Sequence, residues 1–355
     1  DIYFVNGAAH PDLGKPDPSF HNRLYRNDGE LRFTDVTGEA GVAGRGFAMG
    51  VAAADYDNDG DTDIFVAGVN HNVLYRNNGD GTFSDATGEA GVSGIREDGG
   101  KMWSVAAAWL DYDRDGWLDL FTVNYLMWDY DREIFCGNTE KGYRAYCHPR
   151  YYGGLPNQLY RNNRDGTFTD VSAATGIARH IGKGMAVAVA DYDLDGYPDI
   201  FVTNDTLPNF LFHNEGGKGF REAALETGVA FNDDGRVLSS MGAEFRDFDN
   251  DGLPDILVTA LTNETHPLFR NITYPSQIGA LTLGHGGWGC GFFDFNNDGL
   301  KDLFIANGDV QNNVELYSSR RTRQPNTVFA NRGDRTFADH TGASAFGEHL
   351  GQHRG

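Results

Sequence analysis

The chain has 355 residues and carries 51 acidic against 29 basic side chains, a formal net charge of −22 at pH 7. This charge argues against a nucleic-acid partner and against an anionic membrane surface, because binding either one requires clustered Lys and Arg. No apolar run approaches the roughly 20 residues that span a membrane, so we expect no membrane insertion of this segment. The 47 Gly, 24 Phe and 16 Tyr are typical of many short strands joined by tight turns.

An acidic segment recurs five times along the chain. It has Asp or Asn at positions 1, 3, 5 and 9 and Gly at position 6. In chain order, the copies contain Asp55, Asp57, Asp59, Gly60 and Asp63; Asp111, Asp113, Asp115, Gly116 and Asp119; Asp191, Asp193, Asp195, Gly196 and Asp199; Asp247, Asp249, Asp251, Gly252 and Asp255; and Asp294, Asn296, Asp298, Gly299 and Asp302. A short apolar run such as Ile64–Val66 follows each copy and is typical of a strand buried on both faces. Asp1 precedes a similar run and matches the last position of a sixth, truncated copy.

A second motif follows at a variable distance and reads Leu-Tyr-Arg-Asn in its clearest copies. Its copies are Leu24–Asn27, Leu74–Asn77, Leu159–Asn162, Leu211–Asn214, Leu268–Asn271 and Val328–Asn331. Most copies continue through a turn such as Asn78–Gly81 into a last strand such as Phe83–Asp85, which indicates a hairpin. Only the fifth unit lacks a clear last strand. Four short strands in roughly 50 residues predict an all-β protein, a β-propeller of four-stranded blades.

The repeats predict six blades in this chain, the first of which lacks its innermost strand. Arg354-Gly355 resembles Arg45-Gly46, the pair that precedes the strand leading into the first complete acidic loop. We therefore expect residues 1–355 to form a single propeller domain that is incomplete at both ends. A seventh blade would complete the ring in the intact protein, because an open ring leaves exposed sheet edges.

The acidic loops are candidate Ca²⁺ sites. Ca²⁺ takes six to eight oxygen ligands, which side chains at positions 1, 3, 5 and 9 can supply together. An EF-hand would need Glu at position 12 and flanking helices, whereas these loops have Val66, Thr122, Val202, Val258 and Ile305 there. Mg²⁺ fits less well because it prefers few protein ligands, and acidic turns without a metal remain the alternative. We expect about five structural Ca²⁺ ions, with the weakest at the loop that contains Asn296.

The acidic loop and its strand resemble the FG-GAP or VCBS repeat, which also builds the propellers of integrin α-subunits. The fuller pattern, Leu-Tyr-Arg-Asn followed by Gly-Asp-Gly-Thr-Phe, Ala-Gly-Val and the Asp loop, resembles the cartilage acidic protein family, whose members usually carry a further blade and an ASPIC/UnbV domain. The resemblance covers essentially the whole chain. It implies secretion, calcium binding and interaction roles, and it implies no established catalytic chemistry.

Residues 127–156 form a long insertion in the third blade that contains Cys136 and Cys147. A cysteine pair within an irregular loop predicts a disulfide, and two free thiols are the alternative. Haem attachment would need a second Cys at position 144, which is Arg144, and a zinc site with His148 lacks an obvious fourth ligand. We expect Cys290, which lies in a predicted inner strand, to be a small buried core residue.

Two surfaces are candidates for partner binding. The first is the insertion, which is rich in residue types found at interaction hot spots: Tyr143, Arg144, Tyr146, Arg150, Tyr151 and Tyr152. The second is a set of polar residues just after the second strand of each blade, which either line one face or merely suit the turn there: Asn6, Asn70, Asn124, Asn204, Asp205, Asn263, Asn307 and Asp309.

The sequence contains no Ser-His-Asp order, phosphate-binding loop or His-Glu-x-x-His motif. We therefore expect an extracellular, periplasmic or cell-surface scaffold that binds a protein or a glycan, without catalytic chemistry. A polysaccharide lyase or hydrolase built on a propeller is one alternative, since a sequence can hide a cluster of titratable groups. A structural subunit of an envelope complex is the other.

Overall fold

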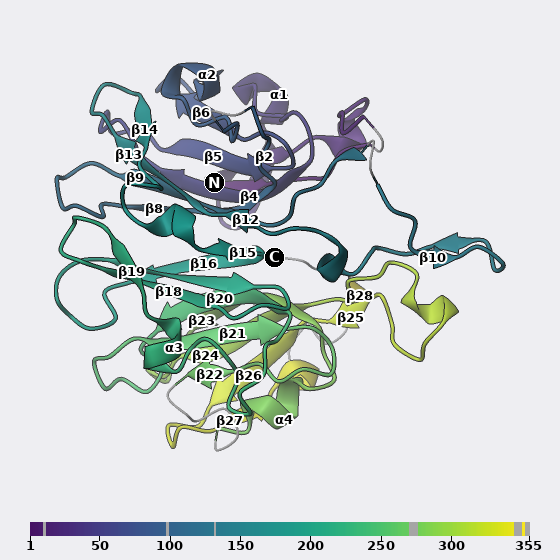
Figure 1. Ribbon diagram of the computed structural model, residues 1–355. Coiled ribbons are helices and arrows are strands. Elements are labelled where there is room, and N and C mark those ends of the chain that lie inside the picture. The colour runs from purple at the N-terminus through teal and green to yellow at the C-terminus, as the bar shows by residue number, and fades with distance from the viewer. Residues whose placement is uncertain (10–11, 97–98, 131–132, 270–275, 344–349, 352–355) are drawn as a thin grey trace. The chain divides into compact units, whose positions relative to one another are not determined.

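The computed structural model describes residues 1–9, 12–96, 99–130, 133–269, 276–343 and 350–351 (Figure 1). Its strands form six antiparallel blades, which confirms the predicted all-β class and the β-propeller architecture. The chain divides into two compact units, Asp1–Arg132 with Tyr152–Gly184 and Asn214–Arg221, and Glu133–Tyr151 with Met185–His213 and Glu222–Gly355. No helix among these residues is long and apolar enough to cross a membrane.

The first unit contains the first three blades. The first blade has the three strands expected of a truncated repeat, in the order β1 (Ile2–Phe4), β2 (Arg23–Gly29) and β3 (Arg32–Asp35). The second has β4 (Ala48–Ala54), β5 (Asp63–Gly68), β6 (Val73–Asn77) and β7 (Phe83–Asp85). The third has β8 (Ser104–Leu110), β9 (Asp119–Asn124), β13 (Gln158–Asn162) and β14 (Phe168–Asp170), and β12 (Leu155–Pro156) pairs separately with β15 (Ile181–Gly182).

The later blades repeat this order. The fourth has β16 (Gly184–Ala190), β17 (Asp199–Asn204), β18 (Phe210–Asn214) and β19 (Phe220–Glu222). The fifth has three strands among the described residues, β20 (Ser240–Arg246), β21 (Asp255–Ala260) and β22 (Leu268–Phe269). The sixth has β23 (Gly287–Phe293), β24 (Asp302–Asn307), β26 (Thr327–Asn331) and β27 (Phe337–Asp339). Short pairs join β10 (Gly137–Asn138) to β11 (Tyr143–Arg144) and β25 (Gln324–Pro325) to β28 (Leu350–Gly351). Arg354-Gly355 and Asn271 lie outside the described residues.

Short helical turns, which the sequence analysis did not predict, close several blades. They are α1 (Thr37–Ala40), α2 (Thr87–Ala90), α3 (Ala224–Thr227) and α4 (Ile278–Thr282), with 3-10 turns η1 (Pro18–Phe20), η3 (Pro149–Tyr151), η4 (Ile177–Arg179), η5 (Val314–Leu316) and η6 (Thr341–Ala343). In α2, the Thr87 hydroxyl donates to Asp85 Oδ1 at 2.6 Å and accepts from the Leu74 N–H at 2.9 Å. This side chain therefore joins the end of the blade to its third strand.

In the second to fifth blades the second strand is the centre of the core, as the apolar runs predicted, whereas β1 of the first blade is exposed at Ile2 and Phe4. Every residue of β5, β9, β17 and β21 is buried. Because each of these strands starts at the last residue of an acidic loop, the buried strand fixes where the loop ends.

The second residue of each acidic loop is aromatic, and three of these rings pack against the following blade. Tyr56 is stacked on Trp109 of β8 with 6.0 Å between ring centroids and lies 5.6 Å from Phe168 of β14. Phe248 contacts Phe292 and Phe337 of the sixth blade in the same way. Aromatic pairs of this kind stabilise by about 0.5–1.5 kcal/mol beyond the area they bury. These loops are therefore anchored in the core at the aromatic second residue and at the buried strand that follows, and the polar residues lie between these two points.

Candidate metal-binding loops and a candidate partner surface

The first Asp of each loop folds the loop backbone. Asp55 Oδ1 accepts from the Asp59 N–H at 3.1 Å, and its Oδ2 accepts from the Gly60 N–H at 2.9 Å. The same pair of bonds forms at the first Asp of the other four loops, Asp111, Asp191, Asp247 and Asp294. The carboxylate at position 1 therefore has a structural role in all five copies in addition to any ligand role.

Two positions of each loop have left-handed backbone. The Gly at position 6 has φ between 87° and 97° in the five copies, which confirms that Gly is placed there for its conformational freedom. Position 4 also has positive φ, with Asn58, Asn250 and Asn297 in three loops. Asn tolerates this region, but the other two loops place Arg114 and Leu194 there, at φ 59° and 61°. The left-handed conformation at position 4 is therefore kept even where the residue, Arg114 or Leu194, disfavours it.

The last Asp of each loop is buried and links two strands. Asp63 Oδ2 accepts from the Tyr56 N–H at 3.1 Å, and its Oδ1 accepts from the Asn77 N–H of β6 at 2.8 Å. Asp1 Oδ1 accepts from the Asn27 N–H at 2.9 Å, which confirms that Asp1 occupies the last position of a sixth loop.

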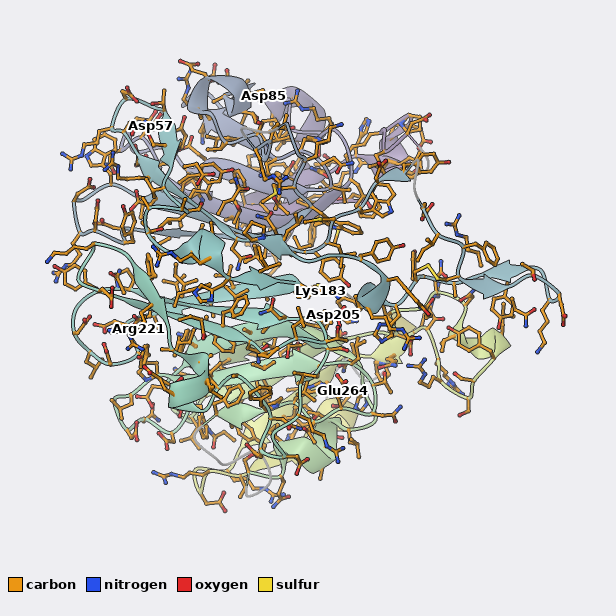
Figure 2. The ribbon with its side chains drawn as sticks, viewed as in Figure 1. Asp57, Asp85, Lys183, Asp205, Arg221 and Glu264 are labelled. Carbon is orange, nitrogen blue, oxygen red and sulfur yellow. A yellow bond between two sulfur atoms is a disulfide. The ribbon has the colours of Figure 1, made fainter. Side chains whose placement is uncertain are left out.

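The loop carboxylates converge as the spacing predicted. In four loops, three carboxylates each place an oxygen atom within 4.8 Å of the other two: Asp55, Asp57 and Asp63; Asp111, Asp113 and Asp115; Asp191, Asp193 and Asp199; and Asp247, Asp249 and Asp251. Asp57 Oδ1, whose residue is labelled in Figure 2, and Asp113 Oδ1 are buried and accept no hydrogen bond from the described part of the chain. A buried carboxylate oxygen without a donor is costly, and a hard cation satisfies it. The residues present thus fit a bound divalent cation.

The loop of the sixth blade, Asp294–Asp302, is different, as its Asn predicted. Asn296 Nδ2 donates to Asp298 Oδ2 at 2.9 Å, so the amide occupies one of the carboxylate oxygens that a metal would use. Among the described residues, this loop forms no cluster of three carboxylates.

Burial raises the pKa of several loop carboxyls. It raises the pKa of Asp63 to about 6 and that of Asp119 to about 7, and the neighbouring carboxylates add to the effect of desolvation. Asp57, Asp113 and Asp302 have raised pKa values for the same first cause. A cation bound among these groups would offset both the burial and the mutual repulsion.

The Asn that ends the Leu-Tyr-Arg-Asn motif connects neighbouring blades, a role that the sequence analysis missed. Asn162 Nδ2 donates to Tyr56 O at 2.8 Å and to Leu118 O at 3.0 Å. Two other copies repeat the contact with the second residue of the preceding loop, Asn214 with Tyr112 O at 2.9 Å and Asn331 with Phe248 O at 3.1 Å. The signal was in the sequence, since this Asn recurs in every copy of the motif. Its partner lies about one or two repeats away, so spacing alone could not name it.

The insertion contains the predicted disulfide, between Cys136 and Cys147, which Figure 2 draws in yellow. It lies against the segment 309–323 that follows β24 (Figure 1). The Tyr146 N–H donates to Gln311 Oε1 at 2.9 Å, and Gln311 Nε2 donates back to Tyr146 O at 3.0 Å. The rings of Tyr143 and Tyr317 are stacked with centroids 5.6 Å apart. We call residues 133–151 and 309–323 together the aromatic lobe.

The aromatic lobe exposes large apolar side chains. Phe135 and Tyr151 are 56% and 55% exposed, and the lobe also exposes Ile134, Tyr146, Leu316 and Tyr317. The guanidinium of Arg150 lies 5.0 Å from the centre of the Tyr151 ring and donates to its hydroxyl at 3.0 Å. Side chains of these types, held on a closed loop, suit the recognition of a partner.

The polar residues after the second strands belong to the turns. The Asn124 N–H donates to Asn157 Oδ1 at 3.0 Å, and Asn124 Nδ2 donates to Pro156 O at 2.9 Å. Asn204 and Asn307 make the same pair of bonds in their own blades and are buried too. Asn70 and Asn263 have the positive φ that Asn accommodates in turns. These five residues therefore stabilise or suit their turns, as one of the two interpretations predicted.

Cys290 is half-buried in β23 and packs against the core cluster that contains Phe248 and Phe292. Burial raises the pKa of its thiol. It is a packing residue, although less completely buried than the sequence analysis predicted.

Three comparisons with known proteins found similar sequences and structures. A family model described as FG-GAP-like repeat matches residues 1–66, 55–122, 129–202 and 191–258, which is more than half of the chain. Cartilage acidic protein 1 of Xenopus tropicalis is 33% identical over 145 residues, 40% of this chain and 18% of that protein. The human protein of the same name is 34% identical over 109 residues, 31% of this chain and 16% of that protein. The match therefore spans less than a fifth of the length of these relatives. Among solved structures, an Agrocybe aegerita lectin that recognises non-reducing terminal N-acetylglucosamine is 18% identical, with a TM-score of 0.43 over 90% of this chain and 73% of the lectin chain.

Proposed function

This chain belongs to the FG-GAP-like repeat family, and from that premise we propose that it is an extracytoplasmic, calcium-binding β-propeller that acts as a binding scaffold for a protein or a glycan. One observation carries the proposal. Three carboxylates converge in each of four loops, those at positions 1 and 3 together with that at position 5 or 9, and in two of the loops a buried carboxylate oxygen has no donor within the described part of the chain.

Calcium in these loops would have a structural role. The ligands would be the side chains at positions 1, 3, 5 and 9, Asp55, Asp57, Asp59 and Asp63 in the second blade and their equivalents in the others. Each loop joins the first and second strands of its blade, and three of the loops carry an aromatic ring, Tyr56, Tyr112 or Phe248, that packs on the next blade. About five ions would add about ten positive charges and offset part of the net charge of −22.

An extracytoplasmic location agrees with both the disulfide and the acidic loops. Disulfides form and persist in oxidising compartments, and the Cys136–Cys147 bond closes an exposed segment. Loops that depend on calcium for their fold suit a compartment in which calcium is abundant.

The aromatic lobe is the surface that we propose contacts the partner. The disulfide and the bonds between Tyr146 and Gln311 hold two segments that are 165 residues apart in the sequence. Holding the lobe in one conformation lowers the entropy cost of binding, and exposed Tyr and Arg supply contact area and hydrogen bonds.

The test is to screen the calcium-loaded chain against arrays of glycans and of extracellular proteins, and to repeat each hit with a variant that combines Phe135→Ala and Tyr151→Ala. Leu225→Ala is the matched control, because Leu225 is exposed on α3 outside the lobe. We expect binding to be lost in the lobe variant and kept in the control. Binding that is the same in the lobe variant and the control, or a catalysed change in the glycan itself, would contradict the proposal.

A further inference from the structure

When the loops are numbered by blade, the fourth loop (Asp191–Asp199) faces a histidine where the second and third loops face an arginine. His213 occupies the third position of the Leu-Tyr-Arg-Asn motif, which Arg76 and Arg161 occupy in the second and third blades. The strand register shows the equivalence, since Tyr75 pairs with Ile64 in the second blade as Phe212 pairs with Ile200 in the fourth. The change therefore places an imidazole beside the acidic loop.

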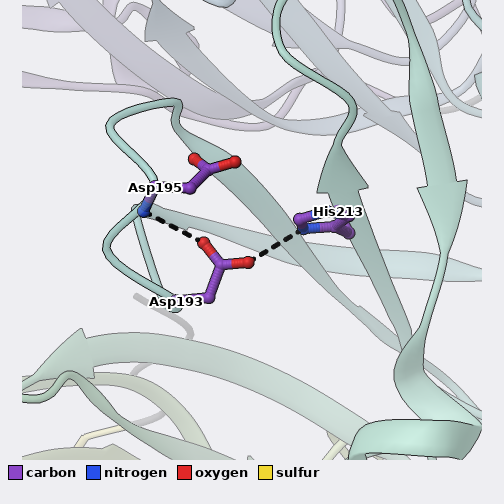
Figure 3. Close-up of side chains that lie close together, drawn as sticks. All are labelled: Asp193, Asp195 and His213. Carbon is purple, nitrogen blue, oxygen red and sulfur yellow. Dashed lines mark hydrogen bonds and ion pairs between the residues drawn. The ribbon is translucent and has the colours of Figure 1, made fainter.

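The imidazole of His213 points into the carboxylate cluster (Figure 3). Its Nδ1 lies 3.4 Å from Asp193 Oδ2 and 3.3 Å from Asp199 Oδ1. The Nδ1 atom is buried, and the side chain as a whole is 19% exposed. The Tyr192 ring contacts the imidazole edge to face, with centroids 5.9 Å apart, and holds its orientation.

The nitrogen and the oxygens are close enough to share one ion. His213, Asp193 and Asp195 each place a ligand atom within 4.8 Å of the other two, and so do Asp191, Asp193 and Asp199. Asp193 belongs to both groups. The nitrogen of His213 and several carboxylate oxygens are thus within reach of a shared ion.

The residue type decides which ion this position favours. Arg is always protonated and has no lone pair, so Arg76 and Arg161 cannot be ligands. A neutral imidazole has a lone pair, and it suits zinc and other first-row transition ions, whereas calcium prefers oxygen ligands alone. The loops of the second and third blades therefore keep an all-oxygen ligand set, and the fourth does not.

We propose that the fourth loop is a mixed nitrogen–oxygen metal site that takes a divalent first-row transition ion such as Zn²⁺ in preference to Ca²⁺. The proposal rests on the proposed function in one respect, namely that these loops bind metal. The competing interpretation is that His213 acts only as a cation paired with Asp193 and Asp199, in which case Arg could replace it without changing the metal that binds.

The protein is stripped of metal and then saturated with Ca²⁺, and Zn²⁺ is titrated into it by calorimetry. Anomalous diffraction at the zinc edge then locates the bound ion. We expect one Zn²⁺ per chain, placed between Asp193 and His213. His213→Arg restores the residue found in the second and third blades, and we expect it to weaken zinc binding at this loop by at least about tenfold. His213→Gln, with an uncharged side chain, is a second variant. It keeps the test informative if His213→Arg does not fold.

Arg161→His provides a matched gain of function, because it places the same imidazole beside the third loop. We expect this variant to bind one additional Zn²⁺. Unchanged zinc binding in His213→Arg would overturn the proposal and assign the zinc to other histidines. Equal competition by Ca²⁺ at the fourth loop would overturn it too. If the second and third loops bind no Ca²⁺ while the fourth binds Zn²⁺, the calcium proposal fails and this one stands.

Discussion

Replacing Asn162 tests the contact between neighbouring blades most sharply. Asn162 is only 3% exposed, and its amide donates to Tyr56 O and Leu118 O, while its Oδ1 accepts from the Arg164 N–H at 2.8 Å. Tyr56 is the second residue of the first complete acidic loop, so the Asn162 side chain ties the third blade to the loop of the second.

Asn162→Ala removes all three hydrogen bonds and leaves at least two carbonyl groups without this donor in a buried environment. A buried polar group that loses its partner costs about 1–3 kcal/mol. Because both carbonyls are held in place by the surrounding strands, we expect the free energy of unfolding to fall by about 2–4 kcal/mol in total. Asn163→Ala is the control, since Asn163 is exposed and, among the described residues, its side chain bonds to Thr167 and Thr169 alone.

The assay is urea unfolding at saturating Ca²⁺, followed by Trp fluorescence and circular dichroism. The control should lose less than about 1 kcal/mol, because water can replace its exposed hydrogen bonds. If Asn162→Ala and Asn163→Ala differ by less than about 0.5 kcal/mol, the contact between blades does not carry the stability assigned to it.

Three further predictions follow from the loops and the insertion. Burial raises the pKa of Asp119 from its ordinary value of 3.8 to about 7. With a chelator present, the stability that the protonated Asp119 gives the folded protein at pH 4 should therefore be lost as the pH rises through 7. A melting temperature that rises over this pH window would contradict burial as the cause of the raised pKa. In a urea titration, Leu194→Asn should raise the free energy of unfolding by about 1 kcal/mol, because Leu194 is 60% exposed and has a positive φ. Leu253→Asn in the next loop is the control and should give no gain, because the φ of Leu253 is not positive. Replacing Cys136 and Cys147 by Ser should speed tryptic cleavage within residues 133–151, measured by mass spectrometry, with little change in the global melting temperature; equal cleavage rates would show that the disulfide does not hold the lobe.

The repeated features of the fold were predictable because each is encoded locally. A loop of Asp55, Asp57, Asp59, Gly60 and Asp63 followed by a buried strand needs only its own residues to form, and the structure has it in every blade where the motif is complete. The disulfide was predictable for a similar reason, since both cysteines lie in one short segment.

The contacts that were missed join residues far apart in the sequence. Asn162 lies 106 residues from Tyr56, and no periodicity indicates which carbonyl its amide reaches. The aromatic lobe depends on Gln311 and Tyr146, which are 165 residues apart and belong to different segments of the chain. The His213 contact could not be predicted for another reason, because His213 departs from a motif whose third residue is Arg in the clearest copies, and only the fold shows that this position lies beside Asp193.

Counting the ions is the most direct test of the central claim. Metal-free protein is titrated with Ca²⁺ alone in a calorimeter, and its thermal unfolding is recorded with Ca²⁺ and with excess chelator. We predict about five bound ions per chain, with the weakest at the loop that contains Asn296, and a large fall in the melting temperature when the chelator is added. No binding heat together with an unchanged melting temperature would contradict the account, and the acidic loops would then be turns held by hydrogen bonds alone.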